Sequence, residues 1–314
     1  MNEHTRIDAD NLKAILKSEK KLSKMVIAEF NRIGPLEFRE ATSIEFENII
    51  IEIIRRLTST KTPKSGKSFK DNWEANWNQT LAKNISNSDD ENYIPSFIPS
   101  NGLLRFEERY IVPISPNFQI NILSIIRVYL FEKYFQDLEQ VYEFGAGTGH
   151  NLLHFSEMYP EKQSMGLDWS NSAVNLIKLM AKKMNRRISA MEFDMLEPNF
   201  SFDVEKDSGL LTVGALEQIG TDWKPFLHYM LTKKFKVYIN IETHFESYDD
   251  SKLLGLLARE YIIKRNWLQG YFAELHKLEA AGQIEILESK KILGSTFHDS
   301  WSFTVWKLQN NSIF

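Results

Sequence analysis

The segment Val141-Tyr142-Glu143-Phe144-Gly145-Ala146-Gly147-Thr148-Gly149 decides the fold of this chain. It reads as a short buried strand that carries an acid and runs into a turn with glycine at every second position. Glycine permits positive φ and lets backbone N–H groups approach a ligand closely. The spacing is G-x-G-x-G and differs from the G-x-G-x-x-G of dinucleotide-binding folds, because position 150 is His. The carboxylate of Glu143 would repel a pyrophosphate, but it suits a ligand that carries an ammonium group.

Further segments with the pattern of buried strands follow this turn, and helical patterns separate the first five of them. The seven strand candidates are 141–144, 164–168, 188–193, 210–213, 237–242, 284–287 and 301–306. The second candidate closes on Asp168, Asp194 follows the third, and Gly214 follows the fourth. This order predicts an α/β fold with a doubly wound, mostly parallel sheet that ends in a hairpin-like pair of strands.

The glycine turn and these acids resemble the motifs of the class I (Rossmann-like) S-adenosylmethionine-dependent methyltransferases. The resemblance covers roughly residues 138–308 and implies seven strands, of which the last is antiparallel. It implies that the chain binds S-adenosylmethionine and releases S-adenosylhomocysteine. The ammonium group of the ligand suits Glu143, and its carboxylate suits the N-terminus of the following helix.

The same resemblance assigns cofactor contacts to the strand-end residues. It implies that Asp168 binds the ribose hydroxyls, that Trp169 packs on the adenine and that Asp194 faces the adenine amino group. Asp168 as a helix N-cap and Asp194 in an Asx-turn remain the structural alternatives. The residues expected at the cofactor are Glu143, Phe144, Gly145, Ala146, Gly147, Asn151, Asp168, Trp169, Asp194, Met195 and Gly214.

Three ranges of the chain differ in character. Residues 1–92 are expected to form an N-terminal helical region, and residues 119–314 the methyltransferase domain with a helical insertion at 249–282. Residues 93–118 are irregular and rich in proline and aromatic residues. We interpret this range as a lid on the substrate side, since ligands of doubly wound folds bind at the carboxyl edge of the sheet. A hydrophobic strap over the N-terminal helices is the alternative. The lid offers Arg105, Arg109 and Tyr110 as acceptor contacts.

A hydroxyl acceptor would need a base to remove its proton, whereas an amine needs only its neutral form. The candidates at the carboxyl edge are His244, Glu217 and His298. His244 ranks first, because it lies just past the end of the fifth strand candidate and an imidazole titrates near neutrality. Asp249 and Asp250 lie near the same edge but are also typical of a helix start, so no metal is expected.

Composition restricts the possible partners of the 314-residue chain. The net charge of −4 gives no electrostatic reason to expect nucleic acid. There is no cysteine, which excludes disulfides and thiolate metal sites. The sequence has no long apolar run and a polar N-terminal stretch, so no membrane span or signal peptide is expected, and cytoplasm is the expected location. Nothing in the sequence indicates the oligomeric state.

The sequence therefore predicts a methyltransferase that acts on a small-molecule or glycan-like acceptor, with oxygen favoured over nitrogen. One alternative is methylation of a protein, a peptide or an amine. Another is a non-catalytic partner subunit that binds S-adenosylmethionine, although the presence of Glu143, Gly145, Gly147 and Asp168 argues against it. Transfer of an aminopropyl group is a third, but no feature indicates a polyamine pocket.

Overall fold

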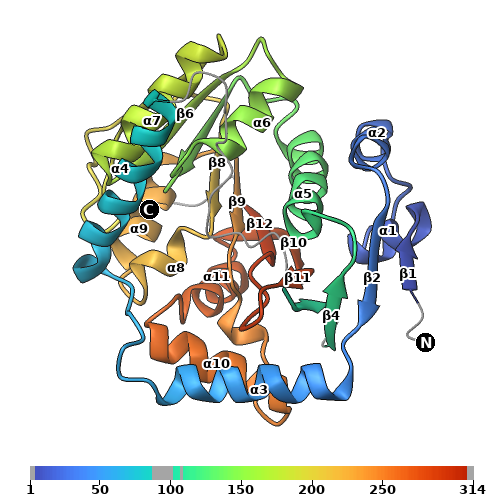
Figure 1. Cartoon of the computed structure of the whole chain (residues 1–314). Helices are drawn as coiled ribbons and strands as arrows, with labels where there is room; N and C mark the ends of the chain where they lie inside the picture. Colours follow the sequence, from blue (N-terminus) through green and yellow to red (C-terminus); the bar gives the residue numbers. More distant parts are fainter. Residues whose placement is uncertain (1–3, 87–101, 107–108, 310–314) are drawn as a thin grey trace.

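The computed structural model describes residues 4–86, 102–106 and 109–309, and a seven-stranded sheet forms its centre (Figure 1). The order of the strands is β10-β12-β9-β8-β5-β6-β7. Their bounds are β5 Gln140–Phe144, β6 Gln163–Asp168, β7 Ile188–Glu192, β8 Ser208–Val213, β9 Val237–Ile241, β10 Ile284–Lys290 and β12 Phe303–Leu308.

The directions of these strands match the expected sheet. The five strands from β9 to β7 are parallel to one another, whereas β12 is antiparallel to both β9 and β10. β6 and β7 extend the sheet on one side of β5, and β8 and β9 extend it on the other side. The order in which strands are added therefore reverses between β5 and β8. This reversal leaves a crevice at the carboxyl ends of the two strands, where doubly wound folds bind ligands.

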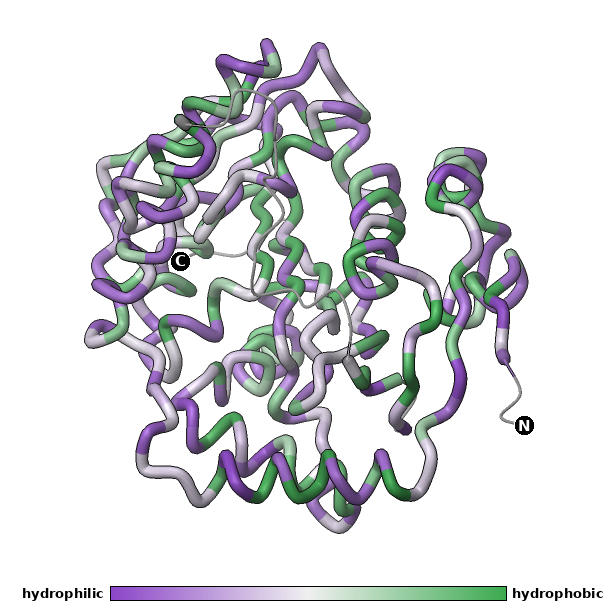
Figure 2. Tube along the Cα trace, viewed as in Figure 1, coloured by the Kyte–Doolittle hydropathy of each residue, from purple (hydrophilic) through white to green (hydrophobic). Residues whose placement is uncertain are grey.

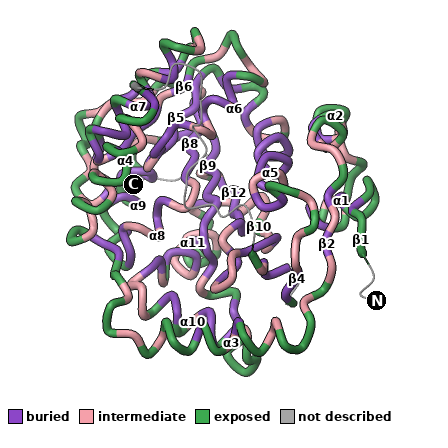
Figure 3. Tube along the Cα trace, viewed as in Figure 1, coloured by how far each residue is buried: buried purple, intermediate pink, exposed green. Residues whose placement is uncertain are grey.

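Two helical layers cover the sheet, because alternate strand residues point to opposite faces. Val141 of β5 packs in one core with α5 (Phe118–Tyr134), α6 (His150–Met158) and α7 (Asn171–Lys183). Tyr142 and Phe144 of the same strand pack in a second core. That core contains residues of α8 (Leu216–Ile219), α9 (Lys224–Lys233) and α11 (Tyr271–Ala280). Figures 2 and 3 show that apolar and buried residues are concentrated in these central layers.

A second, five-stranded sheet lies beside the first, and sequence reasoning missed it. Its order is β1-β2-β4-β3-β11, and each neighbouring pair is antiparallel. The bounds are β1 His4–Ile7, β2 Leu36–Glu40, β3 Leu104–Phe106, β4 Arg109–Pro113 and β11 Leu293–Gly294. The range 1–92 therefore holds two strands besides its helices. The small sheet also joins strands from all three of the ranges that the sequence distinguishes.

The remaining helices lie around the two sheets. In the N-terminal range they are α1 (Ala9–Ile15), α2 (Lys24–Ile33), α3 (Ser43–Thr58), the short 3-10 helix η1 (Lys67–Phe69) and α4 (Lys70–Ser86). After β9 come a second 3-10 turn, η2 (Phe245–Ser247), and α10 (Leu253–Arg265). α3 lies along α10, and α4 packs against α7 (Figure 1). Within the described ranges, no helix combines the length and the apolar character that crossing a membrane requires.

Candidate active site

The carboxyl ends of the central strands open into a cavity of about 520 Å³. Most of the residues that the sequence assigns to the cofactor line it: Glu143, Gly145, Ala146, Gly147, Asn151, Asp168, Trp169, Met195 and Gly214. Two of the expected residues, Phe144 and Asp194, do not line the cavity. Phe144 is fully buried among Phe193 and Phe226, because it follows Glu143 in the strand and points to the other face. Asp194 forms an ion pair with Lys70 of α4, beside the cavity.

Glu143 is a buried carboxyl group with one oxygen left without a partner. Asn151 donates a hydrogen bond from Nδ2 to its Oε1 at 2.6 Å, and Arg127 donates from Nη1 to Oδ1 of Asn151 at 2.9 Å. Oε2 of Glu143 has no hydrogen-bond partner among the described residues. Burial raises the pKa of Glu143 to about 8, against the opposing effects of Asn151 and Arg127. A cationic ligand would satisfy the free oxygen and stabilise the charged form.

The glycines of the turn are required by close contacts. A Cβ on Gly145 would lie 2.4 Å from Cβ of Ala215, and φ is +71° at this residue. A Cβ on Gly147, where φ is +53°, would lie 2.9 Å from a ring carbon of Trp77. Both positions therefore combine left-handed backbone with a neighbour that leaves no room for a side chain.

Asp168, the last residue of β6, holds the turn from the adjacent strand. The backbone N–H of Gly147 donates to Oδ2 of Asp168 at 2.9 Å, and that of Ser170 donates to Oδ1 at 3.0 Å. Burial raises the pKa of Asp168 to about 6. A carboxylate oxygen can accept more than one hydrogen bond, so both oxygens can still accept from a ligand that enters the cavity.

α4 closes one side of the cavity. Glu74 accepts hydrogen bonds from the hydroxyls of Ser170 and Ser172, both at 2.5 Å, and thereby fixes α4 at the start of α7. Trp73 and Trp77 line the cavity as a stacked pair, with ring centroids 5.4 Å apart. The sequence shows these tryptophans on one helical face, which is more often a core pattern. Their place beside the glycine turn depends on tertiary contacts that no local pattern reports.

Two of the three candidate bases are linked at the cavity wall through Thr243. Thr243 Oγ1 donates to Oε2 of Glu217 at 3.2 Å and lies 2.8 Å from Nδ1 of His298. Both Glu217 and His298 line the cavity. Burial and the nearby Glu242 raise the pKa of Glu217 to about 8, and burial lowers the pKa of His298 to about 3. His298 is therefore neutral, and its Nδ1–H can donate to Thr243 while Thr243 donates to Glu217.

His244, the favoured base in the sequence, does not line the cavity. Its Nε2 lies 3.2 Å from Oγ1 of Thr304, and its ring centroid lies 3.9 Å from that of Phe272. The reason is local: His244 has extended backbone and directly follows Thr243, so the two side chains point in opposite directions. The ranking of His244 above Glu217 and His298 is therefore corrected by the geometry.

The strand order, the reversed β12 and the glycine turn after β5 together identify the architecture. The chain has the class I methyltransferase fold. No protein-family model matches the sequence. Over 68 residues the chain is 37% identical to an uncharacterized protein of Rickettsia prowazekii (strain Madrid E), which is 20% of this chain and 27% of that protein. The chain thus spans about a quarter of the length of this curated relative.

Several solved structures are similar to the chain. Magnesium protoporphyrin IX methyltransferase from Synechocystis PCC 6803, with bound S-adenosylhomocysteine, has a TM-score of 0.48 and 11% identity, covering 77% of this chain and 100% of that one. The cyclase SpnF has a TM-score of 0.47 and 15% identity, covering 74% and 78%. An O-methyltransferase from neocarzinostatin biosynthesis has a TM-score of 0.41 and 12% identity, covering 61% and 57%. The fold assignment itself rests on the strand order and directions.

The expected acceptor contacts of the methyltransferase fold lie behind the cavity wall. Arg105, Arg109 and Tyr110 are in β3 and β4 of the small sheet and do not line the cavity, whereas the nearby Leu103 and Leu104 do. Tyr110 donates to the backbone oxygen of Thr296 at 2.6 Å. Arg109 pairs with Glu40 in β2. Much of the predicted lid at 93–118 lies outside the described residues.

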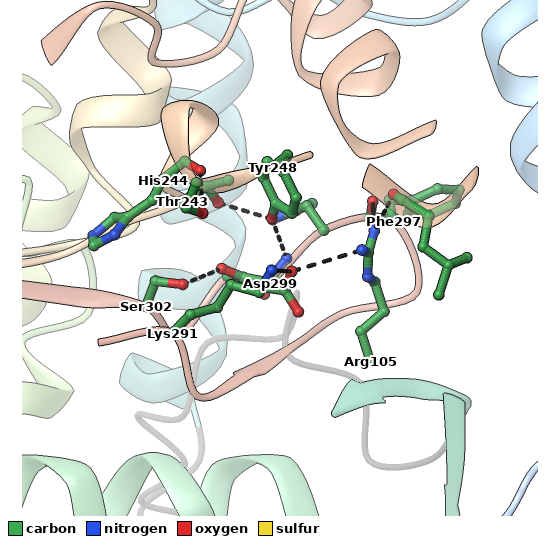
Figure 4. Close-up of polar contacts among 12 residues, drawn as sticks. Arg105, Thr243, His244, Tyr248, Lys291, Phe297, Asp299 and Ser302 are labelled. Carbon is green, nitrogen blue, oxygen red and sulfur yellow. Dashed lines mark hydrogen bonds and ion pairs between the residues drawn. The ribbon is translucent and has the colours of Figure 1, made fainter. Parts of the chain in front are cut away.

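Arg105 belongs to a buried group of charges centred on Asp299 (Figure 4). Its guanidinium lies 3.7 Å from Oδ2 of Asp299, and Lys291 Nζ lies 3.5 Å from the same oxygen. The backbone N–H of Asp299 also donates to Tyr248 at 2.7 Å. Arg105 and Asp299 have side chains only 2% and 3% exposed. These contacts fix the loop that carries His298, so Arg105 supports the site from outside.

The helical insertion contributes further lining residues that the sequence did not assign. Tyr261, Arg265 and Trp267, from α10 and the turn after it, line the cavity together with Phe297. The sequence shows these aromatic residues and Arg265 in the insertion, but their direction depends on how α10 packs. Asp249, weighed as a metal ligand, accepts from the backbone N–H and the hydroxyl of Ser251. Across residues 4–86, 102–106 and 109–309, no three acidic or histidine side chains gather in a way that suits a metal ion.

Proposed function

We propose that this chain is an S-adenosylmethionine-dependent methyltransferase that acts on a hydroxyl group of a small molecule. One observation carries the proposal. The unpartnered oxygen of Glu143 and the hydrogen-bonded chain from His298 to Glu217 belong to the same cavity. The first suits an ammonium-bearing cofactor, and the second suits removal of a proton from an acceptor.

The residues present fit the cofactor. Oε2 of Glu143 would accept from the ammonium group, and Asp168 at the end of β6 would accept from the ribose hydroxyls. The glycine turn leaves space that a Cβ would fill, and Phe193, Met195 and Trp169 offer apolar and aromatic surface for the adenine. When bound, S-adenosylmethionine supplies an electrophilic methyl carbon, so that an O–C bond forms as the C–S bond breaks.

The chain's own contribution is orientation and proton removal. His298 Nε2 would accept the hydroxyl proton, while Nδ1–H donates to Thr243 and Thr243 passes its proton to Glu217. This relay leaves His298 neutral, in agreement with its lowered pKa, and ends with the proton on the carboxylate of Glu217, whose pKa of about 8 makes it the base of the chain. An amine acceptor would not need this chain of groups. The arrangement therefore favours oxygen over nitrogen.

The test combines transfer of a labelled methyl group with matched substitutions. The purified protein is incubated with labelled S-adenosylmethionine and fractionated small-molecule extracts, and mass spectrometry identifies products that gain one labelled methyl. We expect His298→Ala to lower kcat by about 100- to 10,000-fold, the usual contribution of a positioned acid or base. Thr243→Val should also lower kcat, because it removes the hydroxyl between His298 and Glu217 and keeps the side-chain shape.

The controls use the second buried threonine–histidine contact of the same region. His244→Ala and Thr304→Val remove equivalent groups outside the cavity, and both should retain kcat and affinity for S-adenosylhomocysteine. Full kcat in His298→Ala, or equal losses in the control pair, would contradict the assigned base. Absence of labelled products from any extract, with the cofactor bound, would count against methyl transfer.

A further inference from the structure

The residues that line the cavity differ in the buried polar atoms that they leave without a partner. Beside the glycine turn the unpartnered atom is an acceptor, Oε2 of Glu143. On the wall made by the insertion and by the loop before β12, the unpartnered atoms are donors. They are Nε of Arg265, Nε1 of Trp267 and Nε1 of Trp301. Two further lining residues with unpartnered atoms, Gln119 and His150, can present either a donor or an acceptor.

Arg265 is the cation of this donor wall. It is the last residue of α10 and stacks over the ring of Trp267, with Cζ 4.9 Å from the ring centroid. No carboxylate of the described residues lies within ion-pair distance of its guanidinium. Glu217 is near enough for Arg265 to lower its pKa, but Thr243 and Gln218 already donate to the two oxygens of Glu217. A partly buried guanidinium of this kind is stabilised by an anion that accepts its hydrogen bonds.

The surfaces around Arg265 are flat and aromatic. Tyr261 and Phe297 are stacked, with ring centroids 4.5 Å apart and planes 11° apart. Trp267 meets His298 edge to face at 4.7 Å. These rings line the cavity next to the proposed base. They form an aromatic stretch of the cavity wall that also carries the cationic Arg265 and the proton acceptor His298.

We propose that the acceptor is an aromatic hydroxy acid, with its carboxylate on Arg265 and Trp267 and its hydroxyl on His298. This assignment rests on the proposed function of the cavity and specifies its substrate class. Arg265 and Trp267 offer only hydrogen-bond donors, and Arg265 is positively charged, so together they favour a carboxylate. The aromatic wall favours a planar body, and the relay through Thr243 favours a hydroxyl as the reacting group. A neutral or cationic analogue would leave Arg265 without its anion.

The experiment measures binding, so that it does not depend on turnover. Calorimetry in saturating S-adenosylhomocysteine compares the hydroxybenzoate isomers with the corresponding hydroxybenzamides, which have the same shape but no charge. We expect at least one hydroxybenzoate to bind about 10- to 100-fold more tightly than its amide, the range expected for hydrogen bonds to a charged group. Arg265→Gln should remove that preference, and Arg265→Lys should retain part of it.

Arg259→Gln is the matched control. Arg259 is also in α10 and also stacks on an aromatic ring, that of Phe245 at 4.3 Å, but it does not line the cavity. This variant should keep the full preference for the carboxylate. Equal affinity for acid and amide, a preference that survives Arg265→Gln, or failure of every hydroxybenzoate to bind while S-adenosylhomocysteine binds would overturn the acceptor class. Failure of S-adenosylhomocysteine itself to bind would instead overturn the proposed function.

Discussion

Glu143 and Glu217 are buried carboxyl groups of one cavity, and their neighbours give them different roles. Burial raises the pKa of each to about 8. Glu143 is held by Asn151 and keeps one oxygen for a ligand, whereas Glu217 is joined through Thr243 to His298. Glu143 and Glu217 could be predicted as site residues from the sequence, because each lies near the end of a strand. The choice of His298 over His244 as the base could not be predicted, because it depends on the direction in which each side chain points.

At the residue scale, binding of S-adenosylmethionine should release a proton from Glu143. The ammonium group of the ligand favours the carboxylate, so below the raised pKa the protein must first lose that proton. Affinity should therefore rise with pH, by up to about tenfold per unit, and level off near pH 8. Calorimetric titrations between pH 6.5 and 8.5 measure this slope in a range above the pKa of Asp168, which is about 6.

Two variants separate the role of Glu143 from that of Glu217. Glu143→Gln should bind S-adenosylmethionine more weakly and show a flat pH dependence. Glu217→Gln should retain the slope, although its pKa is raised to a similar value, because its partners are Thr243 and Gln218. A slope that is lost in Glu217→Gln and kept in Glu143→Gln would reverse the two assignments.

At the element scale, the loop between β11 and β12 carries His298 and is fixed by the charges around Asp299. Removing the anion of a buried ion pair leaves its cations without compensation. Asp299→Ala should therefore lower the free energy of unfolding by about 3–5 kcal/mol, since Arg105 and Lys291 both face this carboxylate. Urea denaturation measures the loss.

Asp250→Ala is the comparison for this change. Asp250 pairs with Arg259 at 3.7 Å, and its side chain is 64% exposed. The substitution should cost no more than about 1 kcal/mol, as for other exposed ion pairs. Similar losses in Asp250→Ala and Asp299→Ala would contradict the role given to the buried group.

Elements of the chain differ in how far the sequence predicted them. The strands of the central sheet and the glycine turn could be predicted, because their buried runs and strand-end acids are local patterns. The small sheet could not, because β1 and β11 have only four and two residues, too few for a period to be recognised. β2 has five residues, as β5 does, but its sequence Leu-Glu-Phe-Arg-Glu is not a buried run. The contact of Trp77 with Gly147 could not be predicted for a different reason, because it joins elements that are distant in the chain.

At the scale of the whole molecule, one hydrophobic core extends from the N-terminal strands to the last strands of the chain. Ile7 of β1, Val26 of α2 and Leu36 of β2 belong to the same buried cluster as Val141 of β5 and Val305 of β12. Lys290 of β10 also donates to the backbone oxygen of Leu16 at 2.9 Å. The N-terminal range therefore shares its core with the central sheet.

This shared core predicts a single cooperative unfolding transition. The tryptophans lie between residues 73 and 306, so their fluorescence reports unfolding of that part of the chain. Far-ultraviolet circular dichroism reports helix content and therefore also follows α1, α2 and α3. The two signals should change together in urea, with coincident midpoints. A separate early transition seen only by circular dichroism would show that the N-terminal elements unfold independently.

The central claim is that this cavity binds S-adenosylmethionine through Glu143 and Asp168. Calorimetric titration with S-adenosylhomocysteine and with NAD tests it most directly, on the wild type and on Asp168→Ala. We expect the wild type to bind S-adenosylhomocysteine and not NAD. Asp168→Ala should lose about 1–3 kcal/mol of binding free energy, the range of charge-assisted hydrogen bonds. Binding of NAD without binding of S-adenosylhomocysteine, or unchanged affinity in a folded Asp168→Ala protein, would contradict the account.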